Sequence, residues 1–147
     1  MAVGERKDPY KNHRFLVEID GVAQAGFREV TIPETEQDVI EYREGNEPPG
    51  VRKLSGLPKY GNAVLRWGVT DSLDLYQWRK LVEEGKMNDA RKNMAIVLIN
   101  EEGQTTARWE FTAAWPARYA APQLNALANE VAIEQMEIAH EGMRRTQ

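Results

Sequence analysis

The chain has 147 residues, a formal net charge of −4 and a sequence pI near 5.3. This length fits one domain with its own core, so we expect a single domain over residues 1–147. Nucleic-acid binding needs clustered Lys and Arg without matching acids, and the interspersed charges here argue against it as the main function. Because the chain has no cysteine, disulfides, cysteine zinc ligands and a thiolate nucleophile are excluded.

No apolar run approaches the ~20 residues that a membrane helix needs. Residues 1–9 contain no apolar signal region, and we expect a protein made in the cytoplasm without a membrane anchor. The start of the chain is polar and interrupted by Gly and Pro, so residues 1–12 are expected to form a flexible N-terminal arm.

Alternating polar and apolar residues predict a half-buried strand over residues 14–20, with Phe15, Val17 and Ile19 on one side. A second apolar run over residues 27–32 predicts a hairpin-like return of this strand, with a spacer longer than a two-residue turn. Pro33 is expected to end the return strand, because proline cannot donate to a sheet.

A third strand is expected over residues 36–43, with Val39 on one face and Ile40 and Tyr42 on the other. Neither face is then purely core or purely solvent, which suits the wall of an oligomer. Repeated Gly and Pro interrupt the sequence that follows, so we expect a long loop over residues 44–61. Loops of this length in a compact domain are usually functional or disordered.

The second half of the chain predicts three more strands and one helix. Residues 62–68 alternate, with Ala63, Leu65 and Trp67 on one side. Helical spacing predicts a helix over residues 73–85, with N-cap residues at 70–72 and Gly85 closing it. Residues 93–99 and 105–114 are expected to pair as a buried hairpin that Trp115-Pro116 ends. The four tryptophans are interpreted mainly as core residues, with Trp115 the least certain.

Residues 130–140 are ambiguous. Ala132, Met136 and Ala139 fit a helix. Two alternating pairs, Val131 with Ile133 and Met136 with Ile138, fit a strand whose inward side changes once between them, as a β-bulge would produce. Propensity alone gives even odds.

The sequence shows no set of residues spaced as catalysis or metal binding would need. His13 and His140 are isolated and lack metal-ligand spacing. The adjacent acid pairs at 83–84 and 101–102 point apart, and Ser55 and Ser72 have no nucleophile-elbow sequence. The sequence therefore predicts no catalytic residue, no cofactor site and no metal site, and the chain is not expected to be an enzyme.

Several separated segments, in the same order along the chain, resemble the tail tube proteins of contractile phages and related injection particles. They are Phe15-Leu16-Val17-Glu18-Ile19-Asp20-Gly21, Ile40-Glu41-Tyr42-Arg43-Glu44-Gly45, Arg52-Lys53-Leu54-Ser55-Gly56-Leu57, Tyr60-Gly61-Asn62, Ala107-Arg108-Trp109, Ala114-Trp115-Pro116 and Asn129-Glu130-Val131-Ala132-Ile133-Glu134. The resemblance covers most of the chain.

This resemblance implies a mainly β fold, sandwich-like or barrel-like, with two packed antiparallel sheets and one flanking α-helix. It favours a strand over residues 130–140. It also implies a structural protomer whose hexameric rings stack into a hollow tube for DNA or protein cargo. The expected partners are further copies of the chain, a contractile sheath protein, and baseplate and terminator proteins, all within an assembled phage tail or injection particle in bacterial or archaeal cells.

In this interpretation, the loop over 44–61 contacts the next ring. Opposite charge motivates the candidate self-assembly residues, in which Arg52, Lys53 and Lys59 of one copy meet Glu41 or Glu44 of another. Two alternatives remain. One is a tube-end initiator or baseplate adaptor of the same fold, and the other is a stand-alone β-rich binding domain or small enzyme.

Overall fold

The computed structural model describes residues 14–24, 26–43, 45, 50, 52–70, 72–127 and 130–147. The expected N-terminal arm over residues 1–12 lies outside the described residues. Within the described part, the elements in chain order are β1 (Phe15–Ile19), β2 (Val22–Gln24), β3 (Phe27–Thr31), β4 (Thr35–Tyr42), β5 (Arg52–Tyr60), β6 (Ala63–Gly68), α1 (Asp74–Glu83), α2 (Met87–Ala90), β7 (Lys92–Ile99), β8 (Thr105–Ala120), β9 (Ile133–Ala139) and β10 (Gly142–Arg145).

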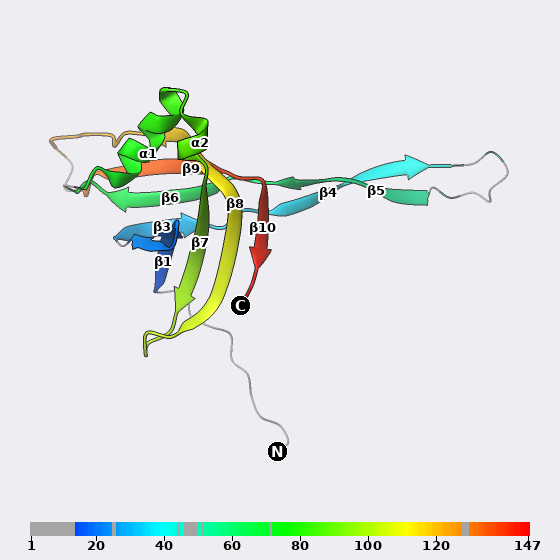
Figure 1. Ribbon diagram of the computed structural model, residues 1–147, viewed down its shortest axis with the longest axis horizontal. Coiled ribbons are helices and arrows are strands. Elements are labelled where there is room, and N and C mark those ends of the chain that lie inside the picture. The colour runs from blue at the N-terminus through cyan, green and yellow to red at the C-terminus, as the bar shows by residue number, and fades with distance from the viewer. Residues whose placement is uncertain are drawn as a thin grey trace, which may run out of the picture.

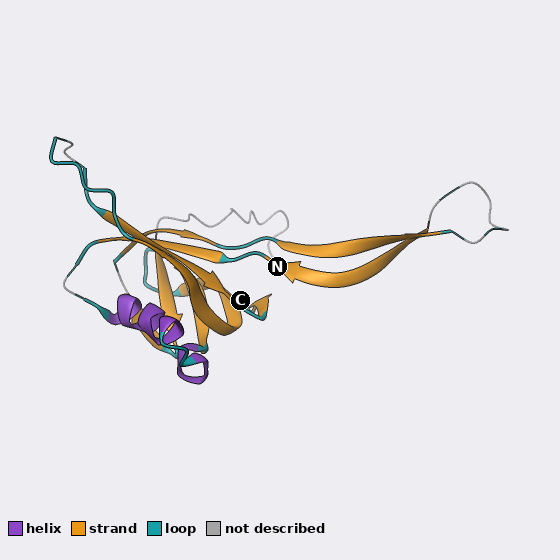
Figure 2. Ribbon diagram, turned by 90° about the horizontal axis from the view of Figure 1, so that it is seen from above, coloured by secondary structure: helices purple, strands orange, loops and turns teal. Residues whose placement is uncertain are grey.

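Two antiparallel sheets form the body and share the long strand β8 (Figure 1). The first sheet runs β2-β1-β7-β8, with β10 on the other side of β8, and the second runs β8-β9-β6-β3. The helix α1 packs on β8, and both helices lie on one side of the body in Figure 2. The expected mainly β fold with two packed sheets and a flanking helix is confirmed.

The core lies between the two sheets. Val17, Phe111, Leu65, Met136 and Ile138 are each no more than 2% exposed, and they come from strands of both sheets. The expected inward face of β6 is confirmed, because its alternate residues are buried. Two of the four tryptophans are also buried, Trp67 on β6 and Trp78 on α1, and Trp78 donates its indole N–H to the backbone oxygen of Ala90.

The return strand after β1 is not the one predicted. Asp20 and Gly21 both have positive φ, 52° and 78°, as a two-residue type I′ turn requires, and β2 pairs with β1 immediately after them. Gly26 has a φ of 87°, and β3 beyond it pairs with β6 of the other sheet. The run over residues 27–32 was therefore correctly predicted as a strand but given the wrong partner.

The prediction that Trp115-Pro116 ends the strand was wrong, because β8 continues to Ala120. Ala113 has a φ of 50°, Ala114 is the last residue of β8 that pairs with β7, and from Trp115 onward β8 pairs with β9. The register shifts between Pro116 and Arg118. Such a bulge leaves a residue unpaired, so a proline without an N–H fits there.

Residues 133–139 form strand β9, so the choice of a strand is confirmed. Its register with β6 is regular from Ile133 opposite Gly68 to Ile138 opposite Ala63. The expected bulge lies in β8 and not in β9.

The helix expected over 73–85 is present as α1, and Gly85 follows it with a φ of 78°. The expected side-chain cap is missing, because Leu73 occupies the N-cap position. The short helix α2 was not predicted. It follows α1 directly and contacts it.

Candidate functional site

Strands β4 and β5 form a two-stranded ribbon that projects from the body along the long axis of the molecule (Figure 1). The prediction of a loop over residues 44–61 was wrong for residues 52–60, which form β5. Gly56 and Pro58, which suggested irregular structure, lie at a β-bulge within this strand. The register shifts between Gln37 and Val39, and Gly56 lies so close to Asp38 that an added Cβ would meet the Asp38 Cβ at 2.8 Å.

Four of the five candidate self-assembly residues lie on the ribbon. Glu41 is directly opposite Lys53 in the register of the same chain. Lys59 forms an ion pair of 3.0 Å with Asp38, also within the chain, and the hydrogen bond to this carboxylate raises the pKa of the Lys59 amine. Arg52 lies opposite Tyr42. The fifth candidate, Glu44, lies outside the described residues.

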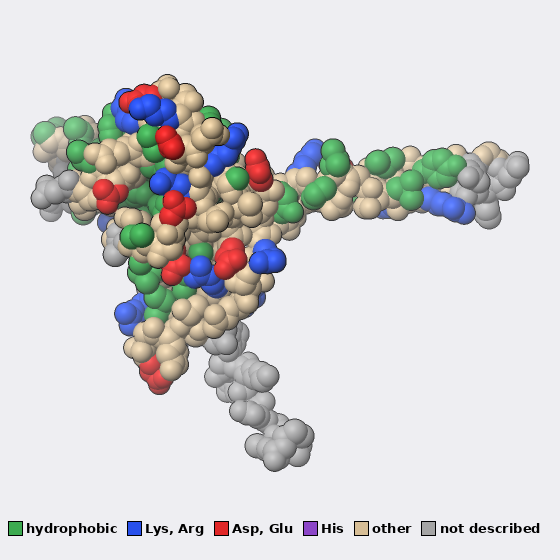
Figure 3. Space-filling model, viewed as in Figure 1, with side chains coloured by type: hydrophobic (Ala, Val, Ile, Leu, Met, Phe, Trp, Pro, Cys, Tyr) green, Lys and Arg blue, Asp and Glu red, His purple; other side chains and the backbone are tan. Residues whose placement is uncertain are grey.

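The ribbon also exposes large apolar side chains, drawn in green in Figure 3, that charge-based reasoning missed. Ile40 and Leu54 face each other across the two strands and are 52% and 49% exposed, and Leu57 is 76% exposed. Val39 and Ile40 point to opposite faces, as the sequence predicted. The alternation of residues 36–43 was the available signal for β4, whereas Leu54 and Leu57 were hidden within the expected loop.

The root of the ribbon is fixed to the body. The backbone N–H of Gly61 donates to the oxygen of Glu34 at 3.0 Å, closing the ribbon at its base. His140 donates its Nε2 hydrogen to the oxygen of Gly61 at 2.9 Å, and its ring packs edge-on against Phe111 and tilted against Tyr60. His140 is therefore a hydrogen-bonded structural histidine, and it ties the ribbon to the core.

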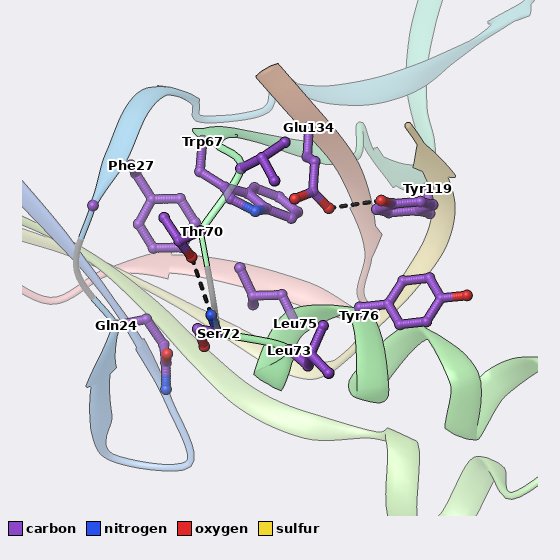
Figure 4. A pocket seen from close by; sticks show the side chains of 12 residues that line it. Gln24, Phe27, Trp67, Thr70, Ser72, Leu73, Leu75, Tyr76, Tyr119 and Glu134 are labelled. Atoms are coloured by element: carbon purple, nitrogen blue, oxygen red, sulfur yellow. Dashed lines mark hydrogen bonds between the residues drawn. The ribbon is translucent and has the colours of Figure 1, made fainter. Parts of the chain in front are cut away.

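A cavity of about 290 Å³ lies at the other end of the body, between β3, β6, β9 and α1 (Figure 4). Phe27 and Trp67 pack edge to face along one wall. On the opposite side Tyr119 donates its hydroxyl hydrogen to Glu134 at 2.6 Å. Burial raises the pKa of Tyr119 to about 12, and the hydrogen bond to the Glu134 carboxylate adds to the shift.

The described part of the chain contains no group of three His, Asp or Glu placed to hold a metal ion. None of the helices in this part is long and apolar enough to cross a membrane. The described surface offers a projecting ribbon with exposed apolar side chains and several lined hollows, which suit binding to another macromolecule.

The family model described as T4-like virus tail tube protein gp19 matches residues 11–144. The chain belongs to this family. The resemblance inferred from the separated sequence segments is thus confirmed over nearly the whole chain. Because the family is structural and its similar solved structures are parts of particles, this tail tube protein is not an enzyme. The small-enzyme alternative is therefore wrong.

Solved structures of injection particles share the fold. A chain of the anti-feeding prophage baseplate is 25% identical with a TM-score of 0.80, over 95% of this chain and 97% of that one. A chain of the PVC extracellular contractile injection system, from its sheath-tube complex, is 24% identical with a TM-score of 0.81, over 94% and 91%. Hcp1 from Flavobacterium johnsoniae is more distant, at 16% identity and a TM-score of 0.54, over 90% and 94%. No curated protein matches the chain.

Proposed function

We propose that this tail tube protein is a structural protomer of the inner tube of a contractile tail or injection particle. Six copies form a ring, and rings stack into a hollow conduit for DNA or protein cargo. Family membership over residues 11–144 and the likeness to chains of the anti-feeding prophage and PVC particles support the proposal.

The β4–β5 ribbon is the observation that carries it. An isolated two-stranded ribbon is at best marginally stable in water. This one leaves the body and exposes apolar side chains on both faces, among them Val39 on one face and Ile40 with Leu54 on the other. A neighbouring copy that covers these side chains supplies the missing burial. The ribbon thus acts as the contact to the next ring.

Unpaired strand edges support closure into a ring. Within the described part of the chain, β2 and β10 border one strand each at the two edges of the first sheet, and β3 does so at an edge of the second. Open edges invite pairing with other chains, and closing copies edge to edge into a cylinder removes them.

The solved structures with this fold suggest the partners. They come from a sheath-tube complex, a baseplate and a tube terminator, and we propose that this chain likewise meets a contractile sheath, a baseplate and a terminator protein. The net charge of −4 is compatible with a lumen that repels acidic cargo and lets it slide.

A tube-end piece of the same fold is the second candidate. The observation that favours it is the likeness to the tube-terminating cap of the anti-feeding prophage, with a TM-score of 0.81 over 99% of both chains. Such a piece forms one ring that does not polymerise.

Electron microscopy of the purified protein in negative stain, across a concentration series, tests both candidates beside size-exclusion chromatography with light scattering. Stacked tubes of uniform width are the expected result. Rings that never stack favour the tube-end piece. A protein that stays monomeric at the highest concentration, and also when short preformed tube seeds are added, overturns both.

A further inference from the structure

Two exposed apolar surfaces of the described chain lie at opposite ends of its long axis. One is the β4–β5 ribbon. The other is the rim of the cavity between β3, β6, β9 and α1, where Val69 and Leu73 are 52% and 57% exposed (Figures 1 and 4). We propose that this cavity receives the apolar face of the ribbon of a second copy. This inference rests on the proposed tube function and names the receiving site.

The ribbon cannot fill the cavity of its own chain. It points away from the body, and its root at Gly61 is held by His140 and by the Glu34 oxygen. A projection at one end and a recess at the other make a heterologous contact, in which each copy gives one surface and receives the other. Such a contact repeats without closing when copies are displaced along one axis, as stacked rings are.

The lining of the cavity suits the apolar face of the ribbon. On that face Ile40 and Leu54 form a cross-strand pair, and Tyr42 opposite Arg52 comes next along the ribbon. The walls of the cavity offer aromatic and aliphatic surface, chiefly Phe27, Trp67, Val69, Leu73, Leu75 and Tyr76. Apolar side chains from the ribbon therefore find apolar partners there.

Charge agrees with this pairing. Glu134 is the single charged residue among those that line the cavity in the described part of the chain. Its carboxylate accepts the Tyr119 hydroxyl through one oxygen at 2.6 Å. Arg52 lies on the same face of the ribbon as the Ile40–Leu54 pair, the face that we propose enters the cavity. A guanidinium brought to a carboxylate in a partly dry cavity makes a favourable, oriented contact.

A larger hollow of about 550 Å³ shares Gln24 and Leu75 with the cavity and lies at the same end of the body. An apolar groove of about 360 Å³ is the competing receptor at a separate place. It lies between β3 and the first sheet and is lined by Val30, Ile32, Leu98 and Trp109. However, only Pro33 and Glu34 separate Ile32 from the start of the ribbon at Thr35, so this groove lies near the root of the ribbon in the same chain. A head-to-tail contact along the ribbon axis reaches the far end of the neighbour, where Trp67 and Leu73 are, before it reaches this groove.

Cross-linking between singly substituted copies tests the assignment. The chain has no cysteine, so each introduced thiol is unique. Leu54→Cys protein is mixed with Leu73→Cys protein, assembled, and treated with a short flexible bismaleimide. The matched control mixes Leu54→Cys with Arg28→Cys, which places the second thiol on the competing groove.

The expected result is a covalent dimer from the Leu73→Cys mixture, formed in tubes and lost when the tubes are dissociated. Tubes that cross-link through Arg28→Cys, or through neither position, overturn the cavity assignment and leave the tube function intact. Failure of the unsubstituted protein to form rings or tubes overturns both.

A second variant protects the test against an unlucky linker geometry. Leu73→Ser removes an exposed apolar side chain from the cavity rim without touching the core, and it is expected to raise the protein concentration needed for stacking by about tenfold or more. Leu124→Ser is the control, because Leu124 is 80% exposed and lies outside the cavity, and it leaves that concentration unchanged. Equal behaviour of the two variants contradicts the assignment.

Discussion

Ile40 and Leu54 lie directly opposite each other in the β4–β5 ribbon, and each keeps about half of its side-chain surface in contact with solvent, 52% and 49%. A cross-strand pair contributes roughly 0.2–1 kcal/mol, which does not explain two large aliphatic residues on a projecting ribbon. We expect Ile40 and Leu54 to be buried by contacts with another copy of the chain.

Replacing both residues, Ile40→Ser with Leu54→Ser, is therefore expected to leave the body folded and to abolish stacking. The free energy of unfolding, measured by urea denaturation, is expected to change by less than about 1 kcal/mol, because surface substitutions seldom do more. Electron microscopy reads out the tubes. Leu54→Met is the control that keeps an apolar side chain and retains assembly. Normal tubes from the double variant would contradict a role of this pair in contacts between copies.

Gly56→Ala probes the bulge that lets the ribbon keep its register. The new Cβ meets the Asp38 Cβ at 2.8 Å, which is closer than real Cβ atoms come, so the two strands must shift. We expect assembly to weaken at least several-fold while the core is unaffected, because the strain stays in the ribbon. Sedimentation of tubes from variant and parent protein measures the effect, and Ser55→Ala serves as the neighbouring control. Unchanged assembly would show that the bulge geometry is not needed.

Charge reversal tests the ionic part of the ribbon contact. Arg52→Glu with Lys53→Glu is expected to weaken stacking, and the loss is expected to shrink as salt rises because exposed charges are screened. Lys53 also faces Glu41 within its own ribbon, so the single variant Lys53→Glu reports how much of the effect is local. If the double variant stacks as well as the parent protein in low salt, Arg52 and Lys53 do not contribute to the interface.

Sequence periodicity was sufficient for the body of the fold. The alternation in residues 62–68 has the right period and the right buried side, because Ala63, Leu65 and Trp67 each fill a core position and local and tertiary preferences agree. The same agreement explains the success over β1 and β7. The sequence also showed no catalytic or metal-binding motif, and family membership confirms the prediction that the chain is not an enzyme.

The sequence alone did not predict which strands pair with each other, nor the long strand β5 with its bulge. Pairing of β3 with β6 depends on the positive φ of Gly26, which redirects the chain between sheets and has no periodic signature. Strand β5 was missed because Gly56 and Pro58 are breakers in isolation, whereas here they flank a bulge opposite Gln37 and Asp38. The cavity joins Phe27, Trp67 and Tyr119 from three strands, and only the folded chain brings them together.

Leu65→Ala is expected to destabilise the folded protomer by about 2–5 kcal/mol. Leu65 is fully buried in the core between Val30 on β3 and Met136 on β9, its register partners, so truncation leaves a cavity that close-packed neighbours fill only partly. Urea denaturation measures the loss. Leu127→Ala, at a residue 98% exposed, is the matched control and is expected to change stability by less than about 0.5 kcal/mol. A small effect of Leu65→Ala would contradict the packing described here.

The Tyr119–Glu134 hydrogen bond predicts a loss of stability at high pH. The pKa of Tyr119 is raised from 10.0 to about 12, first by burial and then by Glu134, so the folded protein holds this proton more tightly than the unfolded chain. The contribution is fully present below pH 10 and is lost as the pH rises from 10 to 12.

For a partly buried group the loss amounts to about 1–2 kcal/mol. Tyr119→Phe removes the titrating hydroxyl, so its stability falls less steeply than that of the parent protein over this pH range. Other tyrosines and lysines titrate there too, and the difference between parent and variant isolates Tyr119. Urea denaturation of both proteins at intervals between pH 8 and 12 gives that difference. Parallel curves would mean that the hydroxyl is equally solvated in the folded and unfolded states.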